Sequence, residues 1–118
     1  MVLDRKTVPN RGEVWLIDFG AGESASARPA IILSTDAAGA IPLRLVAPVA
    51  AWKDGYSGSL WHVKVDAAHT TGLTRASMVD AMQVHGVETG KFLQKLGRVS
   101  STTMDEIATA IAIVVEYC

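Results

Sequence analysis

Two stretches near the start of the chain decide its fold: Arg11-Gly-Glu-Val-Trp-Leu-Ile-Asp-Phe19 and Arg28-Pro-Ala-Ile-Ile-Leu-Ser34. Each is rich in apolar and β-branched residues, which predicts strands over residues 13–19 and 30–34. The first strand presents apolar side chains on both faces: Trp15, Ile17 and Phe19 on one, Val14 and Leu16 on the other. Such a strand has little contact with water, as in a small barrel or a dimer interface.

The middle of the chain continues as strands separated by Gly-rich loops. Further strands are expected over residues 42–48, 60–65 and 77–84. In the second of these, Trp61, Val63 and Val65 point one way, while His62 and Lys64 point the other. The loops are expected at residues 20–27, 36–40, 50–59 and 86–90, and a short helix closed by Gly97 at residues 91–96.

The last segment predicts an α-helix. Thr102 is the expected N-cap, with Asp105 three residues later as a weak capping box. An apolar stripe follows helical spacing and is broad enough to be buried on more than one side: Met104, Ile107, Ala108, Ala110, Ile111, Ile113, Val114 and Val115. The whole pattern predicts a single domain over residues 1–118, mainly β, folded as a small barrel with a C-terminal helix.

Composition restricts the kinds of function that the chain can have. It has 118 residues, 49% hydrophobic and 19% charged, with a formal net charge of -1, so nucleic acid would be bound through a local patch rather than a basic surface. The single cysteine, Cys118, cannot form an intrachain disulfide. No signal peptide or membrane-spanning run is visible, which predicts a cytoplasmic protein. His62, His69 and His85 lack metal-ligand spacing, so neither a metal nor a cofactor is expected.

Four further motifs follow the opening in order: Leu45-Val-Ala-Pro-Val49, Thr71-Gly-Leu-Thr-Arg-Ala-Ser77, Leu96-Gly-Arg-Val-Ser100 and Met104-Asp-Glu-Ile107. Together with the opening, they resemble the MazF/PemK family of toxin ribonucleases. The resemblance implies an SH3-like barrel of the CcdB/PemK kind and a homodimer. It also implies a small antitoxin partner and metal-independent, sequence-specific cleavage of single-stranded RNA.

The resemblance matches Arg28 to the family's catalytic arginine and Glu23 to a family acid. Cleavage without a metal uses the ribose 2′-OH as nucleophile, and negative charge gathers on the phosphoryl oxygens in the transition state. A planar guanidinium suits that charge. Glu23 would receive a base edge or orient the arginine. The alternative for each residue is an ordinary solvated side chain.

The chain departs from the family at Ala50. A threonine or serine usually follows the Ala-Pro-Val motif, and alanine has no hydroxyl to order the 2′-OH or bind the phosphate. Either another hydroxyl compensates, or the protein is a weakened or inactive member that binds an antitoxin, or binds gyrase as toxins sharing this fold do. The candidate substitutes are Ser34, Thr35, Ser57, Ser59 and Ser77.

Several other residues are candidates for substrate binding. Ser24 and Ser26 can donate to phosphate or base, and Arg75 and Ser77 follow a Gly-Leu turn where some family members carry a functional arginine. The aromatic-basic loop can stack unpaired bases, or its rings can fold back onto the core or meet a dimer partner; it comprises Trp52, Lys53 and Tyr56. Asp80 is either a hydrogen-bond acceptor at the edge of the core or part of the site.

Overall fold

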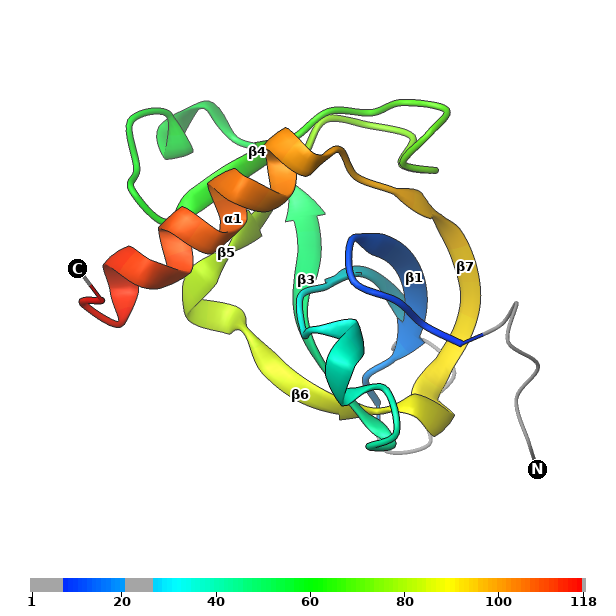
Figure 1. Cartoon of the computed structure of the whole chain (residues 1–118). Coiled ribbons are helices and arrows are strands. Elements are labelled where there is room, and N and C mark those ends of the chain that lie inside the picture. The colour runs from blue at the N-terminus through cyan, green and yellow to red at the C-terminus, as the bar shows by residue number, and fades with distance from the viewer. Residues whose placement is uncertain (1–7, 21–26, 118) are drawn as a thin grey trace.

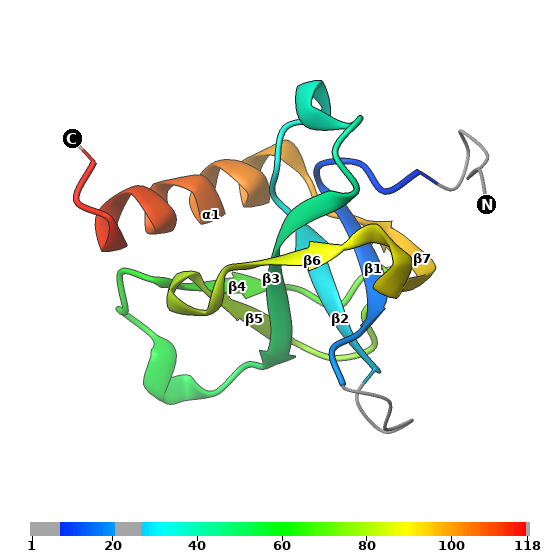
Figure 2. The same ribbon diagram turned by 90° about the horizontal axis from the view of Figure 1, so that it is seen from below.

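The computed structural model describes residues 8–20 and 27–117. Seven strands in these residues curl into a barrel, and one helix lies along one side of it (Figure 1; Figure 2). The strands are β1 (Glu13–Asp18), β2 (Ala27–Ile32), β3 (Leu43–Ala51), β4 (His62–Val65), β5 (Ser77–Asp80), β6 (His85–Glu88) and β7 (Phe92–Arg98), and the helix is α1 (Ser101–Val114). Short 3-10 helices are η3 (Asp36–Ala38), η4 (Asp54–Tyr56), η5 (Ala81–Gln83) and η6 (Thr89–Lys91). The predicted mainly β fold with a C-terminal helix is confirmed.

The long strand β3 joins the two parts of the sheet. The strand order is β4-β5-β3-β2-β1-β7, and β6 pairs with the first half of β3. All pairings are antiparallel: β3 pairs with β6 over Leu43–Val46 and with β5 over Val49–Ala51. Both ends of β3 are therefore fixed, and its last residues cannot shift along β2 without breaking the pairing with β5.

Alternate residues of the central strands enter two separate cores. From β1, Val14 packs beneath α1, whereas Trp15 and Ile17 fill the barrel interior. On β2, Ile31 joins the first core while its neighbours join the second. Burial on both faces of β1, predicted from the sequence, is thus confirmed and is satisfied within one chain.

Several predicted elements between the second strand and the helix were wrong. Residues 91–96 were expected to be a helix, but β7 runs through them. Residues 86–90 were expected to be a turn, yet β6 occupies most of that range. The strand expected over residues 77–84 ends at Asp80, whose carboxylate accepts a hydrogen bond from the Met82 amide and begins η5. Trp61 precedes β4 and is 40% exposed, so it does not share the buried face of Val63 and Val65.

The misassigned strands have identifiable causes. β7 pairs with β1 through two register irregularities, which interrupt the two-residue alternation by which a strand is recognised. In β6, Gly86 lies opposite Leu45, so this glycine belongs to a strand, although Gly86 and Gly90 together are typical of a turn.

The C-terminal helix begins at a different cap from the one predicted. The Ser100 hydroxyl accepts a hydrogen bond from the Thr103 amide, and Thr102 lies inside the helix. Met104, Ile107 and Ala110 form the buried stripe, whereas Ala108, Ile113 and Val115 are exposed. Burial on more than one side was therefore wrong for the single chain. No helix in the described ranges is long and apolar enough to cross a membrane.

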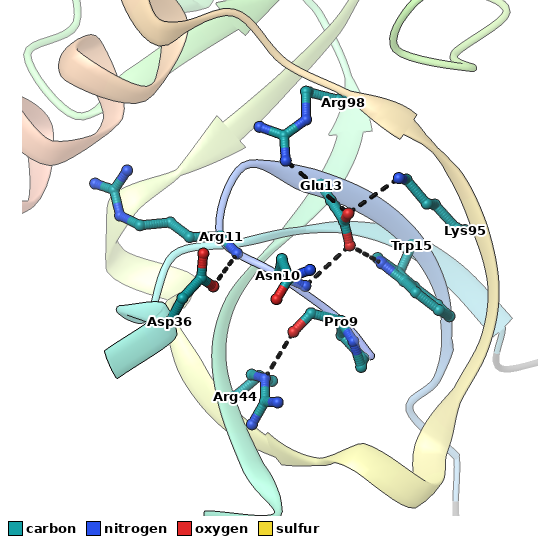
Figure 3. Close-up of polar contacts among 9 residues, drawn as sticks. All are labelled: Pro9, Asn10, Arg11, Glu13, Trp15, Asp36, Arg44, Lys95 and Arg98. Atoms are coloured by element: carbon teal, nitrogen blue, oxygen red, sulfur yellow. Dashed lines mark hydrogen bonds and ion pairs between the residues drawn. The ribbon is translucent and has the colours of Figure 1, made fainter. Parts of the chain in front are cut away.

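A buried carboxylate ties β1 to β7 (Figure 3). The Glu13 side chain accepts hydrogen bonds from the Trp15 indole and the Asn10 amide, both at 2.9 Å. It also pairs with Lys95 at 3.0 Å and, more loosely, with Arg98 at 3.9 Å. Burial opposes ionisation, but the hydrogen bonds and the Lys95 charge outweigh it and hold the pKa of Glu13 below its ordinary value.

A buried guanidinium ties the segment before β1 to β3 on the opposite side (Figure 3). Arg44 is 5% exposed and donates to the backbone carbonyls of Pro9 and Ile41 at 3.0 and 2.7 Å. It also donates to those of Leu43 and Gly39. These carbonyl dipoles solvate the buried charge and fix the start of β3.

Candidate active site

The structure places Arg28 beside the end of β3. β2 and β3 pair with Ala30 opposite Pro48, so Arg28, two residues before Ala30, lies toward the end of β3 that holds Val49 and Ala50. The exposed Arg28 side chain donates from Nη2 to the Val49 carbonyl at 3.4 Å, which agrees with that register. The guanidinium therefore lies over the end of β3, where the sequence lacks the family's hydroxyl.

A pocket of about 320 Å³ opens beside this pair. Its walls come from the end of β3, the start of β5 and the loop before β5: Pro29, Val49, Ala50, Leu73, Thr74, Arg75 and Ser77. Of the predicted site residues, the structure thus gathers Arg75 and Ser77 near Arg28. Arg75 lines the pocket, and Arg28 contacts the carbonyl of Val49, another residue of its wall; guanidinium groups so placed suit a phosphodiester.

Ser77 and Arg75 differ in how accessible they are. Ser77 is 4% exposed, and its hydroxyl donates to the Arg75 carbonyl at 2.9 Å. This bond holds the backbone of the loop, while the Arg75 side chain itself is exposed. The geometry favours Arg75 as the group that meets a ligand and Ser77 as the group that holds Arg75 in place.

Two of the motifs quoted above contact each other beneath this loop. Gly72 has a φ of +74°, and a Cβ atom there would collide with the Leu96 carbonyl. A Cβ atom on Gly97 would collide with the backbone of Thr71 and its neighbour. Each motif thus needs its glycine because the other motif's backbone approaches it, and this contact sets the position of the pocket wall.

Sequence reasoning missed one hydroxyl that lines the same pocket as Ala50. Thr74 lines the same pocket and is exposed, and its side chain makes no hydrogen bond within the described residues. Most of the expected substitutes are engaged elsewhere: Ser34 binds the Leu45 amide, Thr35 caps η3, and Ser59 binds His62. The only signal for Thr74 was its place between Leu73 and Arg75.

The aromatic-basic loop lies next to the pocket, in a separate groove. Trp52 follows β3 directly, and its amide donates to the Ala76 carbonyl. Its ring packs edge-on against Tyr56 at 5.8 Å between centroids, with the Lys64 ammonium 5.4 Å from its centre. The groove has a volume of about 560 Å³ and runs between this loop and α1, whereas the exposed Lys53 does not line it.

The loop is fastened by a hydrogen-bonded histidine. Tyr56 stacks on His62 at 4.2 Å with the two rings nearly parallel. The His62 ring contacts the Ser59 hydroxyl at 2.7 Å through Nδ1 and the Asp80 carboxylate at 3.5 Å through Nε2. Asp80 is thus an acceptor at the core edge that also braces the loop, and it lies away from the Arg28 pocket.

Three of the predicted site residues, Glu23, Ser24 and Ser26, lie outside the described residues. Within the described ranges, no group of three or more His, Cys, Asp or Glu side chains is placed to hold a metal ion.

Comparison with known proteins gives the family. Residues 10–115 match the model of the PemK-like, MazF-like toxins of type II toxin–antitoxin systems. The endoribonuclease MazF9 of Mycobacterium tuberculosis is 29% identical over 107 residues, covering 86% of this chain and 91% of its own length.

Solved structures share the fold. A mycobacterial endoribonuclease in complex with its cognate antitoxin superposes with a TM-score of 0.75 at 23% identity, over 93% of this chain and 97% of that one. The MazE–MazF complex of Deinococcus radiodurans superposes with a TM-score of 0.76 at 21% identity, over 94% of this chain and 99% of that one. The chain belongs to the PemK-like, MazF-like family of toxins of type II toxin–antitoxin systems.

Proposed function

We propose that this protein is the toxin of a toxin–antitoxin pair and cleaves single-stranded RNA. The observation that carries the proposal is the position of Arg28, exposed over the end of β3, where it contacts the carbonyl of Val49 beside a pocket that Arg75 lines. The family and the endoribonuclease relative support the same activity. A small antitoxin neutralises the protein, which works as a cytoplasmic homodimer of single-domain chains.

The proposed reaction needs no metal ion. The ribose 2′-OH attacks the adjacent phosphorus, the bond to the 5′ oxygen breaks, and the products are a cyclic phosphate and a 5′-OH. The Arg28 guanidinium stabilises the charge on the phosphoryl oxygens. Arg75 adds positive charge from the pocket wall, and Glu23 contributes the acid that the family resemblance assigns. Trp52 and Lys53 receive the flanking nucleotides, together with Ser24 and Ser26.

The experiment is cleavage of a long single-stranded RNA in the presence of EDTA. Arg28→Ala should lower the rate roughly 100- to 1,000-fold, the usual cost of losing one transition-state donor, while the melting temperature stays unchanged because the side chain is exposed. Arg11→Ala, at an arginine near the other end of the hairpin, should change neither. Cleavage that requires added magnesium would contradict the proposal.

One observation favours a second function. Ala50 lines the pocket next to Val49, whose carbonyl Arg28 contacts, and brings only a methyl group where the family's hydroxyl would assist the reaction. A protein without that hydroxyl can keep the fold and bind an antitoxin without cleaving RNA. A wild type that is inert on RNA, stays inert as Ala50→Thr, and still binds an antitoxin peptide would establish this binding function instead.

A further inference from the structure

A second depression lies at the end of β1, apart from the Arg28 pocket. It measures about 360 Å³, and its walls are Asp18, Phe19, Gly20, His85, Gly86, Val87, Glu88 and Lys91. Asp18 pairs across the sheet with Ala27, the residue directly before Arg28. The depression and Arg28 therefore lie at the same end of the β1–β2 hairpin, so an RNA strand held at Arg28 can continue into it.

Two rings stand in the walls of this depression. The centroids of Phe19 and His85 are 5.4 Å apart, with the planes tilted by 54°. His85 Nδ1 lies 2.9 Å from the Gln83 carbonyl, and a carbonyl only accepts, so Nδ1 carries the hydrogen. In the neutral ring, Nε2 is then an acceptor. The depression thus combines aromatic surface, suited to stacking on a flat ligand, with a fixed acceptor.

The remaining polar groups are mostly acceptors. The Glu88 carboxylate is exposed and makes no hydrogen bond or ion pair with the described residues. Asp18 uses one oxygen to accept from the Gly20 amide at 2.9 Å and keeps the other. Lys91 supplies one cation. A depression whose polar walls are mostly acceptors suits a ligand with N–H donors.

The four RNA bases differ in how well they match these groups. On its Watson–Crick edge, guanine carries two adjacent donors, N1–H and the N2 amino group, which fit one carboxylate bidentately. Its O6 and N7 acceptors fit an ammonium. Adenine and cytosine each offer one amino donor beside an acceptor nitrogen, and uracil offers a single N–H between two carbonyls, which a carboxylate repels. Guanine is therefore the base that the depression matches.

We propose that this depression is a guanine subsite, in which Glu88 receives N1–H and the N2 amino group, Lys91 meets O6, and the base stacks on Phe19. The inference rests on the proposed function, because it assigns a base of the RNA that Arg28 cleaves. Glu88 is a specificity-determining residue in this scheme and takes no part in the chemistry.

The binding test uses uncleavable 2′-O-methyl heptamers of uridine with one central guanine, inosine or adenine. Wild-type protein should bind the guanine heptamer at least about tenfold more tightly than the adenine one. Inosine lacks the N2 amino group and should lose most of that advantage. Glu88→Gln should bind the guanine and inosine heptamers equally, whereas Asp66→Asn, at an exposed carboxylate outside the depression, should behave as wild type.

The outcomes that overturn the inference are equal affinity for guanine and adenine, a guanine preference that survives in Glu88→Gln, or no binding of the guanine heptamer. Sequencing of the 5′-OH ends from a random RNA separates this inference from the proposed function. Cleavage without guanine at a fixed position would overturn the subsite and leave the ribonuclease intact. Guanine-selective binding without any cleavage would keep the subsite and overturn the ribonuclease.

Discussion

At the scale of single residues, Arg28 stands out for the weakness of its attachment. Within the described residues, its side chain makes one hydrogen bond, to a backbone carbonyl at 3.4 Å. Arg44 on the neighbouring strand, by contrast, is buried and bound to several carbonyls. Arg44 is held by the fold, whereas Arg28 keeps most of its five N–H donors for a ligand.

The hydroxyl at Thr74 gives a prediction about the missing family hydroxyl. If Thr74 acts in place of the residue that Ala50 replaces, Thr74→Val should lower the cleavage rate roughly ten- to a hundredfold, the value of one hydrogen bond to a charged group. Valine keeps the shape, so the fold should not change. Ala50→Thr should raise the wild-type rate and should also restore activity to Thr74→Val. Single-turnover rates of the four proteins would measure this.

Thr70→Val is a suitable control, because Thr70 is also exposed but does not line the pocket. Equal rates for wild type and Thr74→Val would show that the Thr74 hydroxyl has no part in the reaction.

The Glu13 network gives a prediction about stability and pH. The pKa of Glu13 is lowered by folding, so its contribution is complete above the ordinary value of 4.5 and is lost as the pH falls through the lower folded value. Glu13→Gln should lower the free energy of unfolding by about 1–3 kcal/mol at pH 7, because the buried network loses the charge of its carboxylate. The difference in free energy of unfolding between the variant and wild type should become smaller below about pH 4.

Urea unfolding at pH 7 and pH 3 would measure both effects, with the exposed Glu106→Gln as the control. A gap of the same size at both pH values would show that the charge of Glu13 contributes nothing to stability.

The sequence predicted residue roles unevenly. Arg28 could be found because an Arg-Pro pair opens a strand in the correct order among the other motifs. Thr74 and Glu88 could not be identified as candidates from the sequence, because no motif distinguishes a loop threonine or a strand glutamate from others of its kind. They became candidates through neighbours far away in the chain, which only the folded barrel brings together.

At the scale of elements, the strands with a strict two-residue alternation or a continuous apolar run were predicted, as was the helix with its buried stripe. The elements that were predicted wrongly are those in which pairing with another strand, rather than the local spacing of apolar residues, decides the structure. In β7, the spacing of Phe92, Leu93 and Leu96 is also typical of a helix turn, and the pairing with β1 decides the outcome. Irregular strands at the edge of a sheet are the elements that periodicity recognises least well.

The start of α1 gives a prediction that separates the observed cap from the expected one. Ser100→Ala removes the hydroxyl that binds the Thr103 amide and should cost about 1 kcal/mol. Thr102→Ala, one position inside the first turn, should change the stability by about 0.5 kcal/mol or less. Thermal unfolding of both variants would measure the difference. A larger loss at Thr102 than at Ser100 would contradict the assigned cap.

At the scale of the whole molecule, the apolar surface left for a dimer lies away from β1. The apolar faces of β1 were expected in a small barrel or a dimer interface, and the two cores of one chain cover them. Apolar surface is left elsewhere. Ile41, Leu43 and Leu45 are 54%, 47% and 42% exposed, and the last two share a face of β3 beside β6. A strip of this kind is typical of an interface.

We therefore expect a symmetric homodimer that uses this strip. Light scattering at micromolar concentration should give twice the chain mass of 12.5 kDa. The double substitution Leu43→Lys with Leu45→Lys should shift the protein toward the monomer, because two charges would enter an apolar contact. Met82→Lys, at a methionine that is also exposed, should leave the dimer intact. A wild type that is monomeric throughout would refute the expectation.

The division of alternate residues between two cores also fixes the pairing register of the β1–β2 hairpin. If β2 slipped along β1 by one residue, Ile31 would turn into the barrel while Ala30 and Ile32 turned out beneath the helix, so both cores would be filled with side chains of the wrong size at once. A misaligned pairing is therefore destabilised by poor packing in both cores. The position of Arg28 relative to β1 is consequently set by packing in the two cores, and mutations in either core that keep the fold should leave that position unchanged.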